Sequence, residues 1–217
     1  MSFDLLAPHY RWLEWLLAGK KLQRCRTAFV HAIPKPRRVL MLGEGNGRCL
    51  VELLRAYPEA RFTCVDASRR MLDRAQARVR AHGLETERIE FIHADVSGWR
   101  QPAVKFDLLV THFFLDCFRP DQLAQMVPRL AAAATPDARW LLADFREPAS
   151  GIAKWRARGI LRAMYFFFQR VTGLPASRLT PPDAFLQQSG FVLRERSFFE
   201  WGLLHSDLWQ RVAIQHR

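Results

Sequence analysis

Short apolar runs alternate with longer stretches of helical periodicity through the middle of the chain. The apolar runs predict strands at 38–42, 61–65, 89–93, 106–111 and 138–145. The stretches between them predict helices at 49–57, 68–82 and 120–134. Strands and helices that alternate at this spacing form a parallel sheet with helices on both faces.

The two ends of the chain follow other patterns. Residues 3–33 predict one or two helices, which end at Pro34 and Pro36. After the last parallel strand, a long helix is predicted at 151–171 and a short one at 182–189. Two further apolar runs, 191–199 and 208–215, are separated only by a turn, so they predict antiparallel strands. We therefore expect a doubly wound α/β sheet that is mostly parallel and ends in an antiparallel hairpin.

The composition fits a folded enzyme. The 217 residues are 49% hydrophobic, which is enough for a substantial core. Four widely spaced cysteines include no C-x-x-C pair, so no metal site is predicted. The sequence shows no signal-peptide pattern and no apolar run of about eighteen residues, so we expect a cytoplasmic protein. The net charge of +12 favours anionic partners or reflects arginine-rich residue usage.

A glycine-rich loop follows the first predicted strand. The sequence Gly43-Glu44-Gly45-Asn46-Gly47 lies between that strand and a helix. At this place in a doubly wound sheet, glycines let the backbone turn sharply and approach a ligand. The dinucleotide pattern G-x-G-x-x-G requires glycine at position 48, where Arg48 stands, and no P-loop Gly-Lys follows.

Two acids follow the next two strands. Asp66 lies about twenty residues past the glycine loop, where Rossmann-type folds place a carboxylate that accepts hydrogen bonds from ribose hydroxyls. An ordinary loop or capping acid is the alternative, but the position at a strand end favours a ligand. Asp95 follows the third strand and suits either an exocyclic amine of a purine or a helix cap.

Ionisable side chains also stand at the ends of the fourth and fifth strands. His112 is the predicted general base, because imidazole titrates near neutrality; a histidine bonded to a loop carbonyl is the alternative. Asp144, like Asp116, would orient an acceptor or cap backbone amides. His205, in the tail segment, is a weaker candidate.

These pieces, in this order and spacing, resemble the class I, Rossmann-like methyltransferases that use S-adenosyl-L-methionine (SAM). The resemblance covers residues 39–145. It implies that the loop contacts the methionine end of SAM through Gly43, Gly45 and Gly47, with Glu44 and Asn46 between them. The family usually has an acid two residues before the first glycine. Met41 stands there, which leaves open how the SAM amino group is held.

The same resemblance implies roles for the later strand ends. Asp66 would hold the ribose, with Ala67 and Met71 beside it. Asp95 and Val96 would meet the adenine. Thr111 and His112 would lie beside the methyl group that is transferred.

The N-terminal Leu6-Ala7-Pro8-His9-Tyr10 resembles the entry motif of the ubiquinone/menaquinone C-methyltransferase-like branch. This likeness implies that Tyr10 closes over SAM and belongs to the catalytic residues. The expected organisation is one methyltransferase domain, with a helical lid at 1–36, a SAM-binding core at 37–147, a helical acceptor cover at 148–190 and a hairpin at 191–217.

The long helix bears on the acceptor. Its apolar residues follow helical spacing as a stripe of Ile152, Trp155, Ile160, Met164, Phe167 and Val171. Tyr165, Phe166 and Phe168 fall outside that stripe, so the helix carries more aromatic surface than one core contact needs. We expect an apolar pocket and a small, apolar or aromatic acceptor. For the basic residues around the stripe, a solvated helix face is favoured over contact with an anionic membrane.

Two other functions remain open. A nucleic-acid methyltransferase of the same fold would suit the net charge of +12, but the fourth strand is followed by Thr-His-Phe-Phe rather than the Asn/Asp-Pro-Pro-aromatic motif of many base-modifying enzymes. A non-catalytic SAM-binding protein would suit Met41, since that residue replaces the usual acid.

Overall fold

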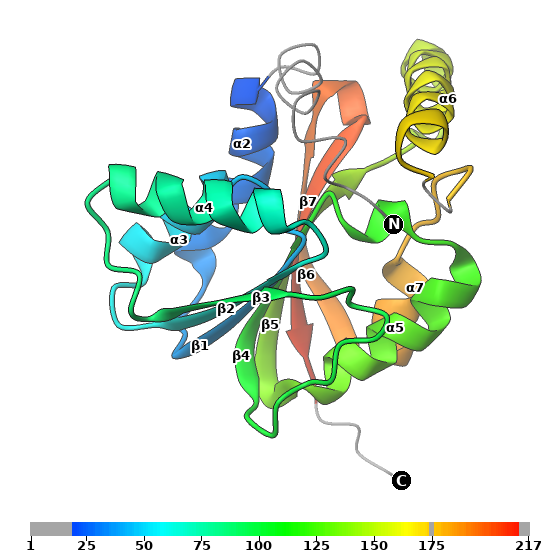
Figure 1. The fold of residues 1–217 in the computed structure, drawn as a ribbon. Helices are drawn as coiled ribbons and strands as arrows, with labels where there is room; N and C mark the ends of the chain where they lie inside the picture. The colour runs from blue at the N-terminus through cyan, green and yellow to red at the C-terminus, as the bar shows by residue number, and fades with distance from the viewer. Residues whose placement is uncertain (1–18, 174–175, 213–217) are drawn as a thin grey trace, which may run out of the picture.

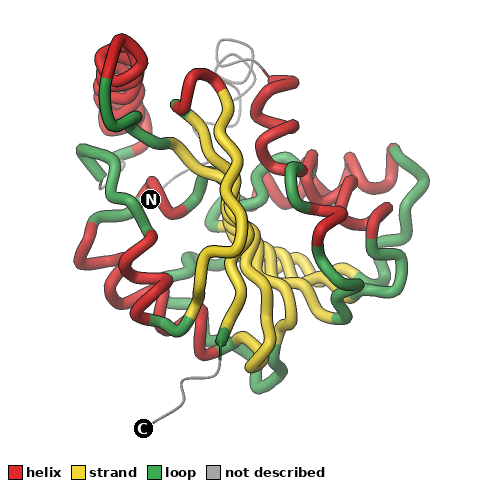
Figure 2. Tube along the Cα trace, turned by 180° about the vertical axis from the view of Figure 1, so that it is seen from behind, coloured by secondary structure: helices red, strands yellow, loops and turns green. Residues whose placement is uncertain are grey.

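The computed structural model describes residues 19–173 and 176–212. Within these residues, a seven-stranded sheet has the order β3-β2-β1-β4-β5-β7-β6. The strands are β1 (Arg38–Leu42), β2 (Arg61–Asp66), β3 (Ile89–His93), β4 (Phe106–His112), β5 (Ala134–Phe145), β6 (Phe191–Phe199) and β7 (Leu204–Arg211). The first five run parallel, and β7 is antiparallel to both β5 and β6. The predicted fold class is therefore confirmed (Figures 1 and 2).

Helices cover both faces of the sheet. One face carries α2 (Gly19–Thr27), α3 (Arg48–Ala56) and α4 (Arg69–Ala81), and the other carries α5 (Pro120–Ala132) and α7 (Asp183–Gln188) (Figure 1). The long α6 (Gly151–Thr172) lies beyond the end of the sheet at which the parallel strands finish. Three short 3-10 helices occur in the described part of the chain: η2 (Val30–Ala32), η3 (Leu115–Cys117) and η4 (Glu200–Gly202).

The sheet has a hydrophobic core on each face. Successive residues of a strand belong to different cores, because their side chains point to opposite faces. Leu40, Leu109 and Trp140 belong to the core under α5. Met41 and Leu108 belong to the core under α3. Since both faces are covered by helices, the strands read as nearly continuous apolar runs, which is why they were predictable.

The predicted range 208–215 for the last strand is wrong, because β7 begins four residues earlier at Leu204. The sequence between 205 and 207 is polar, which broke the apolar pattern. His205, Ser206 and Asp207 are nevertheless buried. They pair in register with the last residues of β5, so that Asp144 lies opposite His205.

The apolar stripe predicted along α6 is also wrong in part. Ile152 and Trp155 are 81% and 70% exposed, whereas Tyr165, expected outside the stripe, is 2% exposed. The buried stripe runs instead through Ala157, Leu161, Met164 and Tyr165. The helix is rotated relative to the predicted packing, because its buried side chains lie in its middle part, residues 157–165, and the first turn is exposed. No helix in the described residues is long and apolar enough to cross a membrane.

The turn from β1 into α3 supplies a test of this fold. Gly47 has φ +78°, and a Cβ there would lie 2.7 Å from the backbone of Ala75. We expect Gly47→Ala to lower the free energy of unfolding by about 3 kcal/mol, through strain and steric overlap. Equilibrium unfolding in urea measures this difference in the free energy of unfolding. Gly83→Ala is the control, because Gly83 has φ +66° and open space around it; it should cost about 1 kcal/mol. An equal loss of unfolding free energy in the two variants would contradict the close approach of Gly47, at the start of α3, to Ala75 of α4.

Candidate functional site

The glycine loop turns sharply between β1 and α3. Gly43, Gly45 and Gly47 have φ values of +64°, +69° and +78°, a region that other residues avoid. A Cβ on Gly43 would lie 2.3 Å from the ring of Phe114. The backbone amide of Gly43 donates to the carbonyl of Val65 at 3.0 Å, so the loop is held against the end of β2. Glycine is needed here for both the turn and the close approach.

Asp66 contacts the glycine loop, and its predicted contact with ribose stays a prediction. One carboxylate oxygen accepts from the amide of Gly45 at 3.2 Å, and the other accepts from the amide of Ser68 at 2.8 Å. Ala67 and Met71 follow at the start of α4, where the amide of Met71 donates to the Ser68 hydroxyl.

The acid after β3 makes a local contact. The Asp95 carboxylate accepts from the amide of Ser97 at 2.8 Å and remains exposed, while Val96 is buried. Residues 96–98 form a turn and not a helix, so the helix cap considered from the sequence is wrong and the carboxylate closes this turn instead. The contact of Asp95 and Val96 with adenine stays a prediction.

The two polar residues at the end of β4, Thr111 and His112, point to opposite faces of the sheet. The Thr111 hydroxyl accepts from Trp140 Nε1 at 2.8 Å and therefore faces α5. His112, the next residue, faces the α2 and α3 side. It is 5% exposed, and neither ring nitrogen has a hydrogen-bond partner among the described residues. Burial, helped by the charge of Arg26, lowers the pKa of His112 to about 3.

Glu44 points toward the start of α3. Its Oε1 accepts from the amides of Cys49 and Leu50, both at 2.9 Å. Burial raises the pKa of Glu44 to about 7. Ligand atoms of Glu44, Cys49 and His112 lie within 4.8 Å of one another, but the charge of Arg26 acts on all three and opposes a metal cation. We therefore assign no metal to this group.

Two buried carboxyls lie at the ends of β4 and β5. The oxygens of Asp144 accept from the amides of Asp116 at 3.1 Å and Phe145 at 2.8 Å. Burial raises the pKa of both Asp116 and Asp144, and the charge of Asp116 adds to the effect on Asp144. Burial therefore favours the protonated, neutral form of both carboxyls. Tyr165 donates to the carbonyl of Asp116 at 3.0 Å, which attaches α6 to this point.

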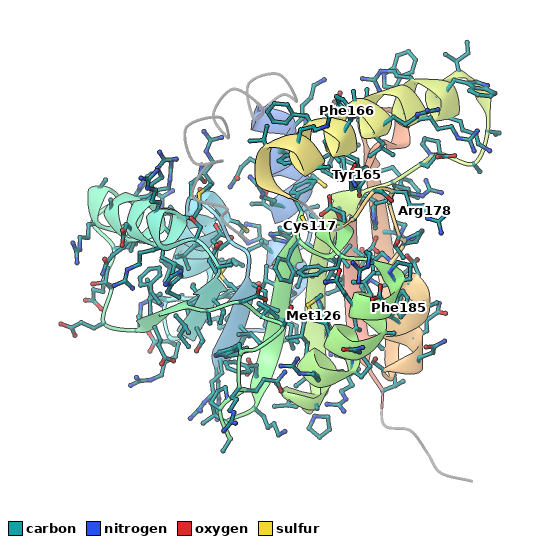
Figure 3. All side chains as sticks on the ribbon, turned by 45° about the vertical axis from the view of Figure 1, so that its right-hand side comes forward. Cys117, Met126, Tyr165, Phe166, Arg178 and Phe185 are labelled. Carbon is teal, nitrogen blue, oxygen red and sulfur yellow. The ribbon has the colours of Figure 1, made fainter. Side chains whose placement is uncertain are left out.

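A cavity of about 870 Å³ lies between α6, the segment 176–183 and the ends of β5 and β7. Its apolar lining comes from Phe145, Trp155, Leu161, Tyr165, Leu179 and Pro181. Its basic lining comes from Arg146, Arg158, Arg162, Arg178 and Arg196. Figure 3 shows Tyr165 beneath α6 and Arg178 on the chain that follows it. The cavity thus offers apolar surface with positive charge around it.

His205 also lines this cavity and belongs to a buried polar network. Its Nδ1 lies 2.9 Å from Asp207 Oδ1. Arg196 donates to both Asp207 oxygens, at 2.7 and 2.6 Å, and Trp209 donates at 3.2 Å. Burial alone would raise the pKa of Asp207, but hydrogen bonds from Arg196 and His205 outweigh it and hold that pKa low.

The ionised Asp207 fixes the tautomer of its neighbour. A carboxylate only accepts, so neutral His205 carries its proton on Nδ1 and keeps the lone pair on Nε2. Sequence reasoning named His205 only as a weak candidate and missed Asp207 and Arg196. The available signal was the i, i+2 spacing of His205 and Asp207, which places both on one face of a strand.

Tyr10 and the motif that contains it lie outside the described residues, so their roles stay predictions.

Comparisons with known proteins bear on the whole arrangement. A family model described as "methyltransferase domain" matches residues 39–137. A demethylmenaquinone methyltransferase from Thermus thermophilus is 30% identical over 171 residues, which cover 78% of this chain and 72% of the relative.

The chain belongs to the class I SAM-dependent methyltransferases.

Solved structures of this fold agree with the assignment. An O-methyltransferase family 2 protein from Planctomyces limnophilus, in complex with apigenin, matches with a TM-score of 0.70 at 17% identity, over 95% of this chain and 62% of that chain. The magnesium protoporphyrin IX methyltransferase of Synechocystis, with bound SAH, matches with a TM-score of 0.58 at 18% identity, over 91% of this chain and 78% of that chain. The Planctomyces protein is therefore considerably longer than this methyltransferase.

The cofactor of this methyltransferase is SAM. The site fits it, because three glycines with positive φ turn the chain sharply at the carboxyl end of β1, and the Asp66 carboxylate stands beside them at the end of β2. When bound, SAM supplies a methyl group on a positively charged sulfur that a nucleophile can displace.

The carboxyl pair gives the methyltransferase a predicted pH dependence. Folding raises the pKa of Asp116 and Asp144, so the stability that the pair contributes is complete at acid pH and is lost as the pH rises through the folded-state pKa. Asp116→Asn supplies an amide donor to Asp144 without a titrating proton. We expect a flatter decline of unfolding free energy with rising pH. Asp73→Asn, exposed on α4, is the control, and an unchanged slope of unfolding free energy against pH in Asp116→Asn would refute a raised pKa at this pair.

Proposed function

We propose that this methyltransferase transfers the methyl group of SAM to a small acceptor whose apolar or aromatic part lies in the cavity beneath α6. The observation that carries the proposal is the apolar lining of that cavity at the ends of β5 and β7. In doubly wound sheets, ligands bind at this edge, beyond the carboxyl ends of the parallel strands. A small acceptor fits a cavity of about 870 Å³.

The cofactor half of the proposed site is the glycine loop. Gly43, Gly45 and Gly47 would leave room for the methionine part of SAM, and the Asp66 carboxylate would accept from the ribose hydroxyls. Asp66 already orders the loop through Gly45 and Ser68, so its oxygens are positioned before the cofactor binds. Asp95 would remain available to the adenine amine.

Methyl transfer is an in-line displacement in which the acceptor atom forms a bond to carbon as the carbon–sulfur bond breaks. Holding the two reactants in line supplies much of the rate enhancement. An acceptor that carries a proton must also lose it, either before or during the transfer.

We place the proton acceptor on His205. Its Nε2 lone pair is set by the contact of Nδ1 with Asp207, and the residue lines the cavity. His112, the base predicted from the sequence, faces the other side of the sheet, and a pKa of about 3 makes it a weak base. Asp144 lies opposite His205 in the β5–β7 register, but it is buried and does not line the cavity, so its role in orienting the acceptor stays a prediction.

The names of related proteins are consistent with small acceptors. They include a trans-aconitate 2-methyltransferase from Rhodopseudomonas palustris, 39% identical over 67 residues that cover 31% of this chain and 23% of the relative. They also include the demethylmenaquinone and apigenin-bound proteins described above. Nucleic acid remains the alternative acceptor, because a net charge of +12 favours binding to phosphates.

The direct test is transfer of radiolabelled methyl from SAM to menadiol, apigenin, trans-aconitate or bulk tRNA. We expect label in at least one small molecule and none in tRNA. Label confined to tRNA, at a rate that falls steeply with salt, would replace this proposal with the nucleic-acid alternative.

Asp66 tests the cofactor half. Asp66→Asn should weaken SAM binding by about tenfold, because hydrogen bonds to a charged acceptor are worth more than those to an amide. Calorimetry measures the affinity. Asp107→Asn is the matched control, because Asp107 also accepts two backbone amides, from Arg37 and Arg38, at the opposite edge of the sheet. Equal SAM affinity in the two variants would remove Asp66 from the site.

The two histidines separate two possible bases. With an acceptor that loses a proton, His205→Gln should lower kcat about a hundredfold while SAM affinity is unchanged. Asp207→Asn should lower kcat as well, because an amide no longer fixes the Nδ1–H tautomer. His112→Gln should have a smaller effect on kcat. A larger loss in His112→Gln than in His205→Gln would return the base to His112.

A further inference from the structure

Exposed apolar side chains gather at one end of the molecule. Four large ones lie there: Ile152 and Trp155 in the first turns of α6, and Phe198 and Trp201 at the connection between β6 and β7. Their exposed fractions are 81%, 70%, 53% and 74%. Figure 1 shows α6 and this connection at the same end of the fold. We call these four residues the tip surface.

Contacts between α6 and η4 make the tip surface continuous. Arg156, on α6, donates to the carbonyl of Glu200 at 3.3 Å, and its guanidinium lies 5.9 Å from the ring centre of Trp201. A Cβ on Gly202 would lie 3.3 Å from Pro148, just before α6. The two exposed tryptophans of the described residues therefore stand on adjoining elements.

The backbone at the connection is strained. Glu200 and Trp201 have φ values of +51° and +60°, a region that L side chains rarely adopt. Such strain persists where surrounding structure holds it, and it is concentrated at functional sites. Tight hairpin turns require positive φ at their central residues, and Arg156 contacts both the Glu200 carbonyl and the Trp201 ring. Trp201 nevertheless keeps 74% of its surface exposed, so the turn presents an aromatic side chain to the solvent.

The charge around the tip surface is positive. Basic side chains there are Arg146, Lys154, Arg156 and Arg158, and the guanidinium of Arg146 lies 4.5 Å from the ring centre of Phe198. The nearby acids are Glu147, paired with Arg158, and Glu200, paired with Lys21. Tryptophan and arginine together suit the headgroup region of an anionic bilayer, where an aromatic ring meets apolar chains and a cation meets phosphate.

We propose that the tip surface docks this protein on an anionic lipid bilayer. Trp201 and Trp155 insert at the headgroup level, and the arginines contact lipid phosphates. Trp155 also lines the cavity, so the bilayer would stand beside the cavity. A lipid-soluble acceptor would then enter from the membrane; this last step rests on the proposed function, whereas the docking does not.

Flotation of the full chain with lipid vesicles tests the docking. We expect binding to vesicles of phosphatidylcholine mixed with phosphatidylglycerol, weaker binding as salt is raised, and little binding to phosphatidylcholine alone. Trp201→Ala and Trp155→Ala should each weaken binding by about tenfold. Val192→Ala and Val104→Ala, which remove exposed apolar side chains outside the tip surface, are the controls and should bind as the wild type does.

Three results would overturn the proposal. The first is no binding to either kind of vesicle. The second is binding that the two tryptophan variants retain, which would assign it to the general positive charge. The third is a dimer in sedimentation that becomes a monomer in Trp201→Ala, which would make a second copy of the chain the partner. An unchanged Tm and SAM affinity in Trp201→Ala keep these results separate from misfolding and from failure of the methyl-transfer proposal.

Discussion

The Asp66 carboxylate holds the end of β2, the glycine loop after β1 and the start of α4 together. It does so with two backbone amides, those of Gly45 and Ser68. The Gly43 amide on the Val65 carbonyl and the Glu44 carboxylate at the start of α3 hold the loop as well. Asp66 is the contact that joins the loop to both β2 and the start of α4. Because the proposed function gives the same carboxylate to the ribose hydroxyls, the order of the loop and the binding of the cofactor would depend on one group.

The other half of the sheet end is built from buried polar groups. Asp116, Asp144, His205 and Asp207 lie there with little exposure, and a buried polar group is costly unless it is hydrogen-bonded. The structure satisfies them with backbone amides, with Arg196 and with Trp209. Burying such groups costs stability, and one of them, His205, lines the cavity. The Asp116–Asp144 pair holds the ends of β4 and β5 together through backbone amides, whereas Asp207 orients the His205 imidazole.

Much of this architecture was readable in the sequence. Strands such as 38–42 and 61–65 are buried on both faces, so apolar runs marked them directly. The glycine loop and Asp66 follow from spacing, because strand ends in a parallel sheet meet at one edge. The start of β7 was not readable, since His205, Ser206 and Asp207 look like a polar turn until their partners on β5 and β6 are known. The rotation of α6 was missed for a similar reason: Tyr165 is buried through its bond to Asp116, a contact between distant parts of the chain.

A crystal structure with S-adenosylhomocysteine tests the account most directly. The account predicts ribose hydroxyls on the Asp66 carboxylate and a sulfur atom that faces the cavity beneath α6, on the side of the sheet that carries His205. A ligand whose sulfur faces His112 and the α2–α3 side, or whose ribose leaves Asp66 without contact, would contradict it.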